Sequence, residues 1–354
     1  MPISVVVGGQ FGSEGKGKTA LAIAQRSKAA IVVRVGGTNS GHTAIDENGV
    51  AWALRQLPVS VLASSAVAIL PPGAIIDPEI FSREVESLRL DRKRVIVNPY
   101  ATVISQSDKE SERASGLIAQ IGSTGSGTGA ALIRRISRQR GEAILARDHA
   151  SLQDYLGDTS EIMRNALNKN GRVVIEGSQG FGLSLFHGGF YPKATSRDTT
   201  AATFLGEAGL SPRDVDDITL VIRAHPIRVA GDSGPLDETS WAEIAKIAGL
   251  PGDYCELTTA TKKVRRVGQF DPTLVRRAIE ANNPTEIVLN HFDYVDDGVR
   301  NGIFSVRSLD FLRTVESSIG RKIDWIGTDP ARLIERTKIT RVGGSPYLKI
   351  FGPT

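Results

Sequence analysis

An apolar, β-branched run near the N-terminus ends directly at a glycine-rich loop. The run spans Ile3 to Val7, and residues 12–19 read Gly-Ser-Glu-Gly-Lys-Gly-Lys-Thr. This spacing fits the phosphate-loop pattern G-x-x-x-x-G-K-[ST], in which backbone N–H groups surround phosphate oxygens and a lysine follows the transferred charge. Because the sequence from Ala20 to Arg26 is helical in pattern, the loop predicts a phosphate site at a helix N-terminus. The alternative is a glycine-rich turn with a solvated lysine.

Similar β-branched runs alternate with helical patterns along the rest of the chain. Strands are expected at residues 3–7, 30–35, 95–97, 172–175, 218–222, 286–289 and 322–326. Helices are expected at residues 18–26, 79–88, 160–168, 241–248, 271–281 and 309–317. The alternation predicts an α/β fold with one large, mostly parallel sheet flanked by helices and with ligands at the carboxyl ends of the strands. No repeat or Pro/Ser-rich linker divides the sequence, so we expect a single domain over residues 1–354 with elaborated loops.

The composition excludes several classes of function. The single cysteine, Cys255, leaves no internal disulfide and no cysteine-based zinc cluster, and the 5 histidines are too far apart in sequence for a typical zinc site. The net charge of +4 comes from interleaved basic and acidic residues, unlike a nucleic-acid-binding tail. The apolar stretch from Val59 to Ile76 contains serines and prolines, so we expect no membrane span, and the N-terminus does not resemble a signal peptide. These features predict a cytoplasmic protein with small anionic ligands.

Two loops that follow predicted strands present side chains suited to proton transfer and to recognition of a purine edge. His42 lies in the glycine-rich segment 36–43, and an imidazole there can donate a proton to an oxygen under attack. Gln179 lies in the segment 176–182 and offers both an acceptor and donors to a purine edge. The alternatives are a polar loop residue for His42 and a turn-stabilising side chain for Gln179.

A third loop, residues 122–129, consists of glycine, serine and threonine. The helix that follows carries three basic side chains, Arg134, Arg135 and Arg138. Hydroxyls, N–H groups and nearby arginines favour a monophosphate pocket over a flexible linker. Residues 125–130 also imitate a dinucleotide fingerprint, but that motif needs a preceding strand, and residues 112–121 are helical in pattern.

Two later segments complete the set of candidate binding loops. In residues 258–268, hydroxyl side chains precede a cluster of lysines and arginines, as a clamp for a small carboxylate requires; the alternative is a solvated charged face. Residues 290–293 approximate the guanine-reading pattern N-K-x-D, with His291 in the place of the lysine and Asp293 able to accept from guanine.

Taken together, these motifs resemble the adenylosuccinate synthetase family over nearly the whole chain. The resemblance lies in residues 9–18, 39–43, 123–125, 176–180 and 265–266. It implies an enzyme that joins aspartate to a purine monophosphate at the expense of a nucleoside triphosphate. It also implies a large parallel-sheet fold that forms a homodimer.

The resemblance further implies roles for individual residues. Catalysis would involve Ser13, Lys18 and His42, with His42 as the acid at the purine 6-oxygen. The monophosphate would be bound by Ser13, Asn39, Thr124, Gln179, Thr195, Lys263 and, from the neighbouring subunit, Arg138. The triphosphate would be bound by Gly12, Gly15, Lys16, Gly17, Lys18, Thr19, Arg265, Asn290, Asp293, Gly327 and Thr328. Aspartate would be bound by Thr259, Ala260, Thr261 and Arg265, and Mg²⁺ by Ser13 and the carbonyl oxygen of Gly41.

Ser13 is the most informative departure from the family pattern, which has a general-base aspartate at that position. A neutral hydroxyl cannot replace a carboxylate as a base or as a strong Mg²⁺ ligand. The shorter side chain leaves room beside purine N1 and C2, where a 2-amino group would project. A phage branch of the family, the 2-aminoadenylosuccinate synthetases, resembles this chain in having serine there and uses dGMP. Lys263 replaces an arginine near the ribose 2'-hydroxyl, which weakens one reason to require ribose.

These departures predict a ligase that phosphorylates the 6-oxygen of dGMP and then lets aspartate displace phosphate, giving N6-succino-2-amino-2'-deoxyadenylate. Asp293 argues for a guanine donor, but His291 and Asp329 depart from the family pattern and the phage branch uses an adenine triphosphate. ATP or dATP is therefore the expected donor, with GTP as the alternative. An ordinary adenylosuccinate synthetase acting on inosine monophosphate (IMP) is the second interpretation. A nucleotide-binding switch is the third, and it leaves His42 and Gln179 unexplained.

Overall fold

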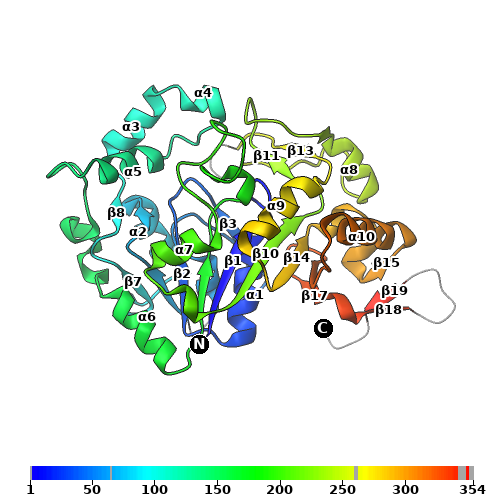
Figure 1. Ribbon diagram of the computed structural model, residues 1–354, viewed down its shortest axis with the longest axis horizontal. Coiled ribbons are helices and arrows are strands. Elements are labelled where there is room, and N and C mark those ends of the chain that lie inside the picture. The colour runs from blue at the N-terminus through cyan, green and yellow to red at the C-terminus, as the bar shows by residue number, and fades with distance from the viewer. Residues whose placement is uncertain (1, 64–65, 259–261, 342–347, 351–354) are drawn as a thin grey trace.

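A nine-stranded sheet runs through the centre of the molecule (Figure 1). The computed structural model describes residues 2–63, 66–258, 262–341 and 348–350. In order across the sheet, the strands are β17 (Leu333–Glu335), β16 (Trp325–Gly327), β14 (Glu286–Asn290), β10 (Val215–Arg223), β1 (Ile3–Gly8), β9 (Val173–Glu176), β2 (Ile31–Arg34), β5 (Val67–Leu70) and β7 (Val95–Val97). Every neighbouring pair from β16 to β7 is parallel, and β17 alone is antiparallel to its neighbour. The predicted α/β class with a mostly parallel sheet is confirmed.

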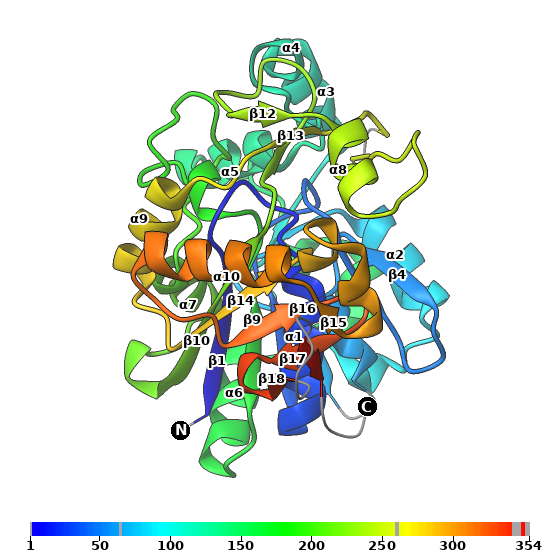
Figure 2. The same ribbon diagram turned by 90° about the vertical axis from the view of Figure 1, so that its right-hand side faces the viewer.

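The sequence of β1 explains why helices cover both faces of this sheet. Successive strand residues point to opposite faces, so Val5 and Val7 enter one apolar cluster and Val6 enters the other. All three side chains are buried, as expected for a central parallel strand. The helices over the first face are α6 (Thr159–Asn168), α7 (Ala201–Ala208), α9 (Pro272–Asn282) and α10 (Val306–Ile319). Those over the second face are α1 (Lys16–Ser27) and α2 (Pro78–Ser87). Figure 2 shows α10 crossing in front of β14 and β16.

Shorter elements gather beyond the carboxyl ends of the central strands. In Figure 1, β1 rises from the N-terminus at the lower edge, while these shorter elements surround the opposite edge. They are α3 (Gln106–Ala114), α4 (Leu117–Ile121), α5 (Thr128–Ser137), α8 (Trp241–Ile247) and the small sheet of β11 (Ile227–Arg228), β13 (Arg266–Gly268) and β12 (Glu238–Thr239). Loops that follow parallel strands form ligand sites in such folds, so the functional residues are expected here.

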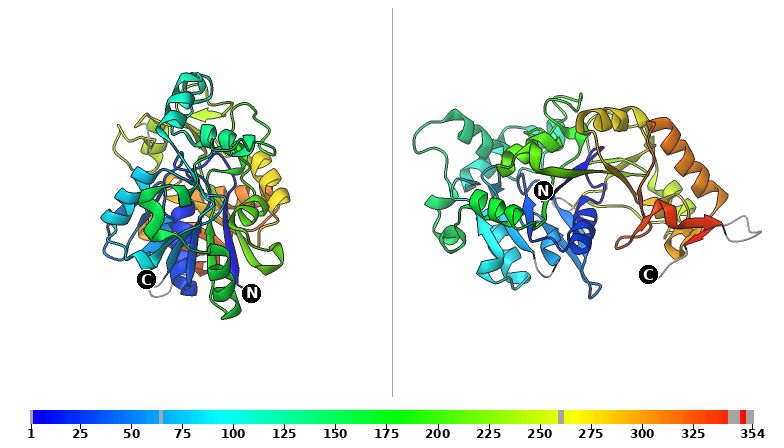
Figure 3. Two further views of the ribbon diagram at one scale, coloured as in Figure 1. Left: turned by 90° about the vertical axis from the view of Figure 1, so that its left-hand side faces the viewer. Right: turned by 60° about the horizontal axis from the view of Figure 1, so that its bottom comes forward.

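Three smaller sheets complete the structure. They are the hairpin of β3 (His42–Ile45) and β4 (Ala51–Leu54), the parallel pair β6 (Ile75–Ile76) and β8 (Thr102–Val103), and the sheet of β15 (Ile303–Phe304), β19 (Leu348–Ile350) and β18 (Ile339–Arg341). Figure 3 shows the region around α10 and β18 at one end of the molecule, and residues 100–170 at the other.

The predicted strands and helices are present, with some boundaries moved. The strand expected at 322–326 begins only at Trp325. Asp324 still pairs with β14, because its backbone N–H donates to the Ile287 carbonyl oxygen (2.9 Å) and its carboxylate accepts from Ile287 N (2.8 Å). The prediction of one continuous helix over residues 112–121 is wrong. The chain forms two helices there, α3 and α4, and the break between them includes Gly116, whose φ is 78°. Strand β5 and the β3–β4 hairpin were missed. None of the helices in the described ranges has the length and apolar content needed to cross a membrane.

Candidate active site

The phosphate loop between β1 and α1 is held in a tight curve by its own acidic residue. Gly12, Ser13 and Gly15 have positive φ angles of 92°, 57° and 88°. The buried Glu14 carboxylate accepts hydrogen bonds from the backbone N–H groups of Gln10 (3.1 Å) and Gly12 (2.8 Å). It also accepts from Lys16 Nζ (2.6 Å), so this lysine is tied to the loop. No side chain caps the start of α1, and an uncapped helix N-terminus is suited to binding phosphate.

Lys18, the lysine of the phosphate-loop pattern, reaches across to the loop that follows β16. Its Nζ atom donates to the carbonyl oxygen of Asp329 (2.8 Å). Burial lowers the pKa of Lys18 to about 8, although the charges of Asp293 and Asp329 oppose the shift. Gly327 leaves room for this contact, because a Cβ atom there would lie 2.6 Å from Lys18 Nζ.

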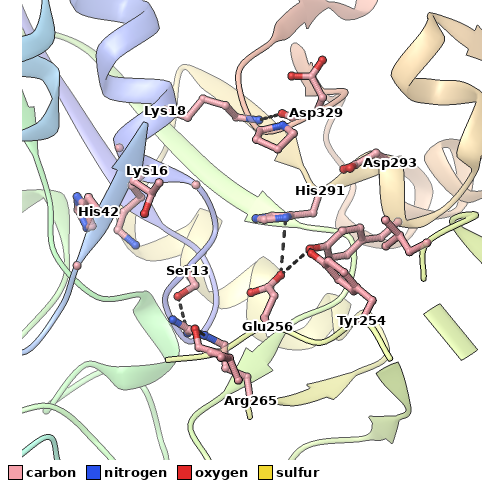
Figure 4. Close-up of a pocket in the computed structure, with 18 of the residues that line it drawn as sticks. Ser13, Lys16, Lys18, His42, Tyr254, Glu256, Arg265, His291, Asp293 and Asp329 are labelled. Atoms are coloured by element: carbon pink, nitrogen blue, oxygen red, sulfur yellow. Dashed lines mark hydrogen bonds and ion pairs between the residues drawn. The ribbon is translucent and has the colours of Figure 1, made fainter. Parts of the chain in front are cut away.

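Two cavities meet at the phosphate loop. The larger, of about 500 Å³, extends past Lys18 to His291, Asp293 and Asp329 (Figure 4). The smaller, of about 130 Å³, extends to the loop around Thr124. Both are lined by the same five residues, Ser13, Lys16, Gly41, His42 and Arg265. A phosphoryl group bound in the larger cavity and an acceptor bound in the smaller one would therefore meet at this shared wall.

Two arginines fix Ser13 in the shared wall. Arg265 Nη1 donates to the hydroxyl oxygen of Ser13 (2.6 Å) (Figure 4). Arg223 Nη1 donates to the Ser13 carbonyl oxygen (3.0 Å). Arg223 is fully buried and forms a two-point ion pair with Glu256 (2.6 and 3.2 Å). Burial would raise the pKa of Glu256, but the charge of Arg223 holds it at about 2. The ion pair thus connects the phosphate loop to the segment that carries Arg265.

His42 stands on the other side of the shared wall, at the first position of β3. Its Nδ1 atom lies 2.6 Å from Glu176 Oε1, and Arg34 contacts both the ring and the carboxylate. Burial, followed by the charge of Arg34, lowers the pKa of His42 to about 3. Burial would raise the pKa of Glu176, but the hydrogen bond from His42 and the charge of Arg34 bring it to about 2. We therefore assign a neutral ring with Nδ1–H donating to an ionised Glu176. An anion bound near His42 would favour the protonated form of its ring, which can donate a proton.

The smaller cavity brings together most of the residues predicted to bind the monophosphate. Asn39, Thr124, Gln179 and Lys263 line it with Ser13. Thr195 does not line it directly, but its hydroxyl accepts a hydrogen bond from Asn39 Nδ2 (3.4 Å).

The structure does not place the remaining predicted residues in these cavities. Arg138 ends α5 on the exposed surface and lines neither cavity. The predicted aspartate-binding residues Thr259, Ala260 and Thr261 lie outside the described residues.

Of the residues predicted to surround the donor base, Asp293 lines the larger cavity, whereas Asn290, Gly327 and Thr328 do not. Several of them already have partners. Asp293 pairs with Arg300 (3.1 Å). Asn290 Nδ2 donates to the carbonyl oxygen of Glu14 (2.9 Å), which ties β14 to the phosphate loop. The Asp329 carboxylate accepts from the backbone N–H groups at 331 and 332 and pairs with the side chain of residue 332. Thr328 is buried, and Asp329 mainly holds a turn.

Four charged residues of the site received no role from the sequence. Arg34 and Arg223 end β2 and β10, and Glu176 ends β9. The sequence did carry a signal for these three residues, because each is a charged residue at the end of an apolar, β-branched run. Charged residues are rarely buried unless they are paired. Glu256 lies in the segment before the predicted carboxylate clamp, and nothing in its local sequence marks it as the partner of Arg223.

Comparisons with known proteins point to one enzyme family. The family model for adenylosuccinate synthetase matches residues 5–148 and 142–300. The adenylosuccinate synthetase of Thermococcus onnurineus is 36% identical over 342 residues, covering 93% of this chain and 96% of that protein. The adenylosuccinate synthetase of Methanocaldococcus jannaschii is 36% identical over 335 residues, covering 92% of this chain and 94% of that protein.

Two solved structures are also similar. The succinoaminodeoxyadenylate synthetase of cyanophage S-2L, bound to dGMP and to dATP as an energy donor, has a TM-score of 0.78 and 28% identity, covering 94% of this chain and 95% of that one. The fully ligated adenylosuccinate synthetase of Plasmodium falciparum has a TM-score of 0.83 and 20% identity, covering 95% of this chain and 100% of that one, and supports the fold alone.

Proposed function

Since the chain belongs to the adenylosuccinate synthetase family of C–N ligases, we propose that it joins L-aspartate to dGMP with cleavage of a purine triphosphate, giving N6-succino-2-amino-2'-deoxyadenylate. The observation that carries this proposal is Ser13 in the wall shared by the two cavities. A hydroxymethyl group there leaves space beside purine N1 and C2 that a carboxylate would fill. The phage synthetase, whose solved structure holds dGMP, supports the same substrate.

The proposed reaction has two steps. The purine 6-oxygen, in the smaller cavity, attacks the γ-phosphorus of the triphosphate in the larger one, and the nucleoside diphosphate leaves. The aspartate amine then displaces the phosphate from C6. Lys18 and the N–H groups of the phosphate loop would stabilise the charge that moves during the first step, and His42 would hold a proton near the 6-oxygen. The single domain over residues 1–354 would carry both steps.

We assign ATP or dATP as the donor. Asp293, the acceptor that a guanine would require, is paired with Arg300 (3.1 Å), and His291 stands where a guanine reader has lysine. The dATP bound to the phage synthetase supports the assignment. GTP is the alternative. Competing the two triphosphates in a single-turnover phosphate-release assay distinguishes them.

Mg²⁺ fits this site as a companion of the triphosphate. The described residues contain no cluster of three or more His, Cys, Asp or Glu side chains suited to a metal. Mg²⁺ in phosphoryl-transfer sites typically takes few protein ligands and several phosphate and water oxygens. The Gly41 carbonyl oxygen, at the shared wall, would be one ligand. The resemblance implied Ser13 as a second ligand, but its hydroxyl oxygen accepts a hydrogen bond from the Arg265 cation, so we propose that the ion is held without it. Bound Mg²⁺ would neutralise charge on the triphosphate.

A homodimer would complete the monophosphate site. Arg138 is exposed at the end of α5, next to the exposed apolar side chains Ile133 (67% exposed) and Ile136 (64% exposed). We propose that this face packs against a second copy and that Arg138 reaches the partner's monophosphate. The enzyme would act in the cytoplasm, that of the host if the chain is phage-encoded, on small molecules and without nucleic acid. Mixing two inactive variants, Arg138→Ala and Ser13→Gly, tests the arrangement, because shared sites restore part of the activity.

The most direct test of the substrate is an assay by mass spectrometry with L-aspartate, ATP and Mg²⁺. We expect an adduct with dGMP and little with IMP. An adduct formed equally well from IMP would favour the second candidate, an ordinary adenylosuccinate synthetase, which the archaeal relatives at 36% identity support. Triphosphate hydrolysis without any adduct would favour a nucleotide-binding switch.

A further inference from the structure

The smaller cavity has cationic and hydroxyl side chains but no carboxylate among its described lining residues. The ionisable side chains that line it are Lys16, His42, Lys263 and Arg265. The acidic groups behind this wall are committed to other partners, Glu176 among them, which pairs with His42 (2.6 Å) and Arg34 (2.9 Å). Glu14 accepts from two backbone N–H groups and from Lys16, and Glu256 lines only the larger cavity. A purine in the smaller cavity would therefore meet no carboxylate that could take a proton from its N1 atom.

The hydrogen bonds around Ser13 determine which way its hydroxyl can act. Arg265 donates to Ser13 Oγ (2.6 Å), and a guanidinium has no acceptor to offer in return. The hydroxyl hydrogen of Ser13 is therefore available to donate toward the cavity. A hydroxyl whose oxygen accepts from a cation becomes a stronger donor. Arg223 fixes the Ser13 carbonyl oxygen (3.0 Å), which limits rotation of the backbone that carries this hydroxyl.

A neutral 6-oxopurine presents N1–H, which is a hydrogen-bond donor. It therefore cannot accept the hydrogen bond that the Ser13 hydroxyl would donate. The N1-deprotonated ring presents a lone pair at N1 and an oxyanion at the 6-position. We propose that Arg265 and Ser13 form a hydrogen-bond relay that binds the purine ring in its N1-deprotonated form. The inference rests on the proposed function and explains how a chain with serine at this position activates its substrate.

The proton and electron movements balance without a carboxylate base. The N1 proton leaves to solvent, and the electron pair of the N1–H bond spreads over N1 and the 6-oxygen. The 6-oxygen then forms its bond to the γ-phosphorus, and the bond from that phosphorus to the bridging oxygen breaks with release of the nucleoside diphosphate. Lys16 lies on the same wall but is paired with Glu14 (2.6 Å), so the Arg265 guanidinium is the positive charge that favours the anionic ring. Ser13 would touch the ring, and Arg265 would be a positioning residue that acts through Ser13.

The relay is tested by NMR on isotopically labelled dGMP bound to the whole protein, because the N1 resonance moves when its proton leaves. For wild type, we expect N1 of bound dGMP to titrate at least about one pH unit below free dGMP, a tenfold gain in the deprotonated fraction. Ser13→Gly removes the hydroxyl yet tolerates the positive φ of 57°, and it should abolish this gain. Arg265→Gln should reduce it.

Ser123→Ala is the matched control, because it removes a hydroxyl that lines the same cavity and donates to Glu112 (2.7 Å). It should leave the titration unchanged. Bound dGMP that titrates at or above the free nucleotide in wild type, or a Ser13→Gly complex that titrates as wild type does, would overturn the relay.

Repeating the titration with IMP separates this inference from the proposed function, because hypoxanthine also carries N1–H. If the enzyme prefers IMP and its N1 still titrates low in a Ser13-dependent way, the relay holds and dGMP specificity fails. If dGMP is the substrate and its N1 titrates normally, the proposed function holds and the relay fails.

Discussion

Lys18 Nζ donates to the carbonyl oxygen of Asp329 at 2.8 Å, and this bond joins the phosphate loop to the loop after β16. The two residues are 311 positions apart in sequence, and the parallel sheet places them at the same edge. The lysine that would follow the transferred phosphate is therefore held by a backbone group. If a triphosphate binds, its anionic oxygens would replace the neutral Asp329 carbonyl oxygen as the acceptor for Lys18. This exchange favours the charged form of Lys18.

The lowered pKa of Lys18, about 8, predicts that triphosphate binding becomes weaker in alkaline solution. Above pH 8 the free protein carries mostly neutral Lys18, whereas the bound phosphate favours the charged form, so binding must take up a proton. Affinity should then fall by up to about tenfold for each pH unit above 8. Titration calorimetry in buffers of different ionisation enthalpy measures this uptake. Affinity that does not change between pH 7 and 9.5, with no proton uptake, would contradict the assignment of Lys18 to the phosphate site.

Gly327→Ala should abolish triphosphate binding and leave the fold intact. A Cβ atom at this position would lie 2.0 Å from Asn290 Oδ1 and 2.6 Å from Lys18 Nζ, so both side chains would have to move. Equilibrium dialysis with labelled ATP measures binding, and circular dichroism reports the fold. Gly206→Ala in α7 is the control, because nothing lies within 4 Å of its Cβ position. It should bind normally, with slightly higher stability.

Glu256→Gln should lower both stability and activity. The substitution leaves Arg223, which is fully buried, without its charged partner, and breaking a buried ion pair in this way costs about 3–5 kcal/mol. Urea unfolding measures the loss. Asp310→Asn removes a partner from the exposed Arg313–Asp310 pair (2.9 Å) and should change the free energy of unfolding by less than about 0.5 kcal/mol. Equal losses for the two variants would show that the Arg223–Glu256 pair does not hold the phosphate loop.

Local patterns were enough to predict the sheet and the position of the site. Most predicted strands were β-branched runs, and burial on both faces of the sheet makes such runs continuous and easy to recognise. The loops that bear Ser13, His42 and Gln179 follow three of these strands, so they meet at one edge of the sheet. Strand β5 was missed because Val67–Leu70 lies inside a longer apolar stretch, where no periodicity separates it from its surroundings.

The pairing of charged residues could not be predicted, because it depends on distant segments. Arg223 and Glu256 are 33 residues apart, and Arg34 and Glu176 are 142 apart. Neither distance follows from sequence spacing. Asp293 matched a guanine reader locally, but its pairing with Arg300 depends on how the chain turns after β14.

The account depends most on Ser13, and competition between two substrates tests it most directly. The ratio of kcat/KM for dGMP to that for IMP should be measured for wild type and for Ser13→Asp, with aspartate, ATP and Mg²⁺ held constant. We predict that wild type favours dGMP and that Ser13→Asp moves the ratio toward IMP by at least about tenfold, which corresponds to about 1.4 kcal/mol of differential transition-state binding. The same ratio in both proteins, or a wild-type enzyme that uses IMP as readily as dGMP, would contradict the account.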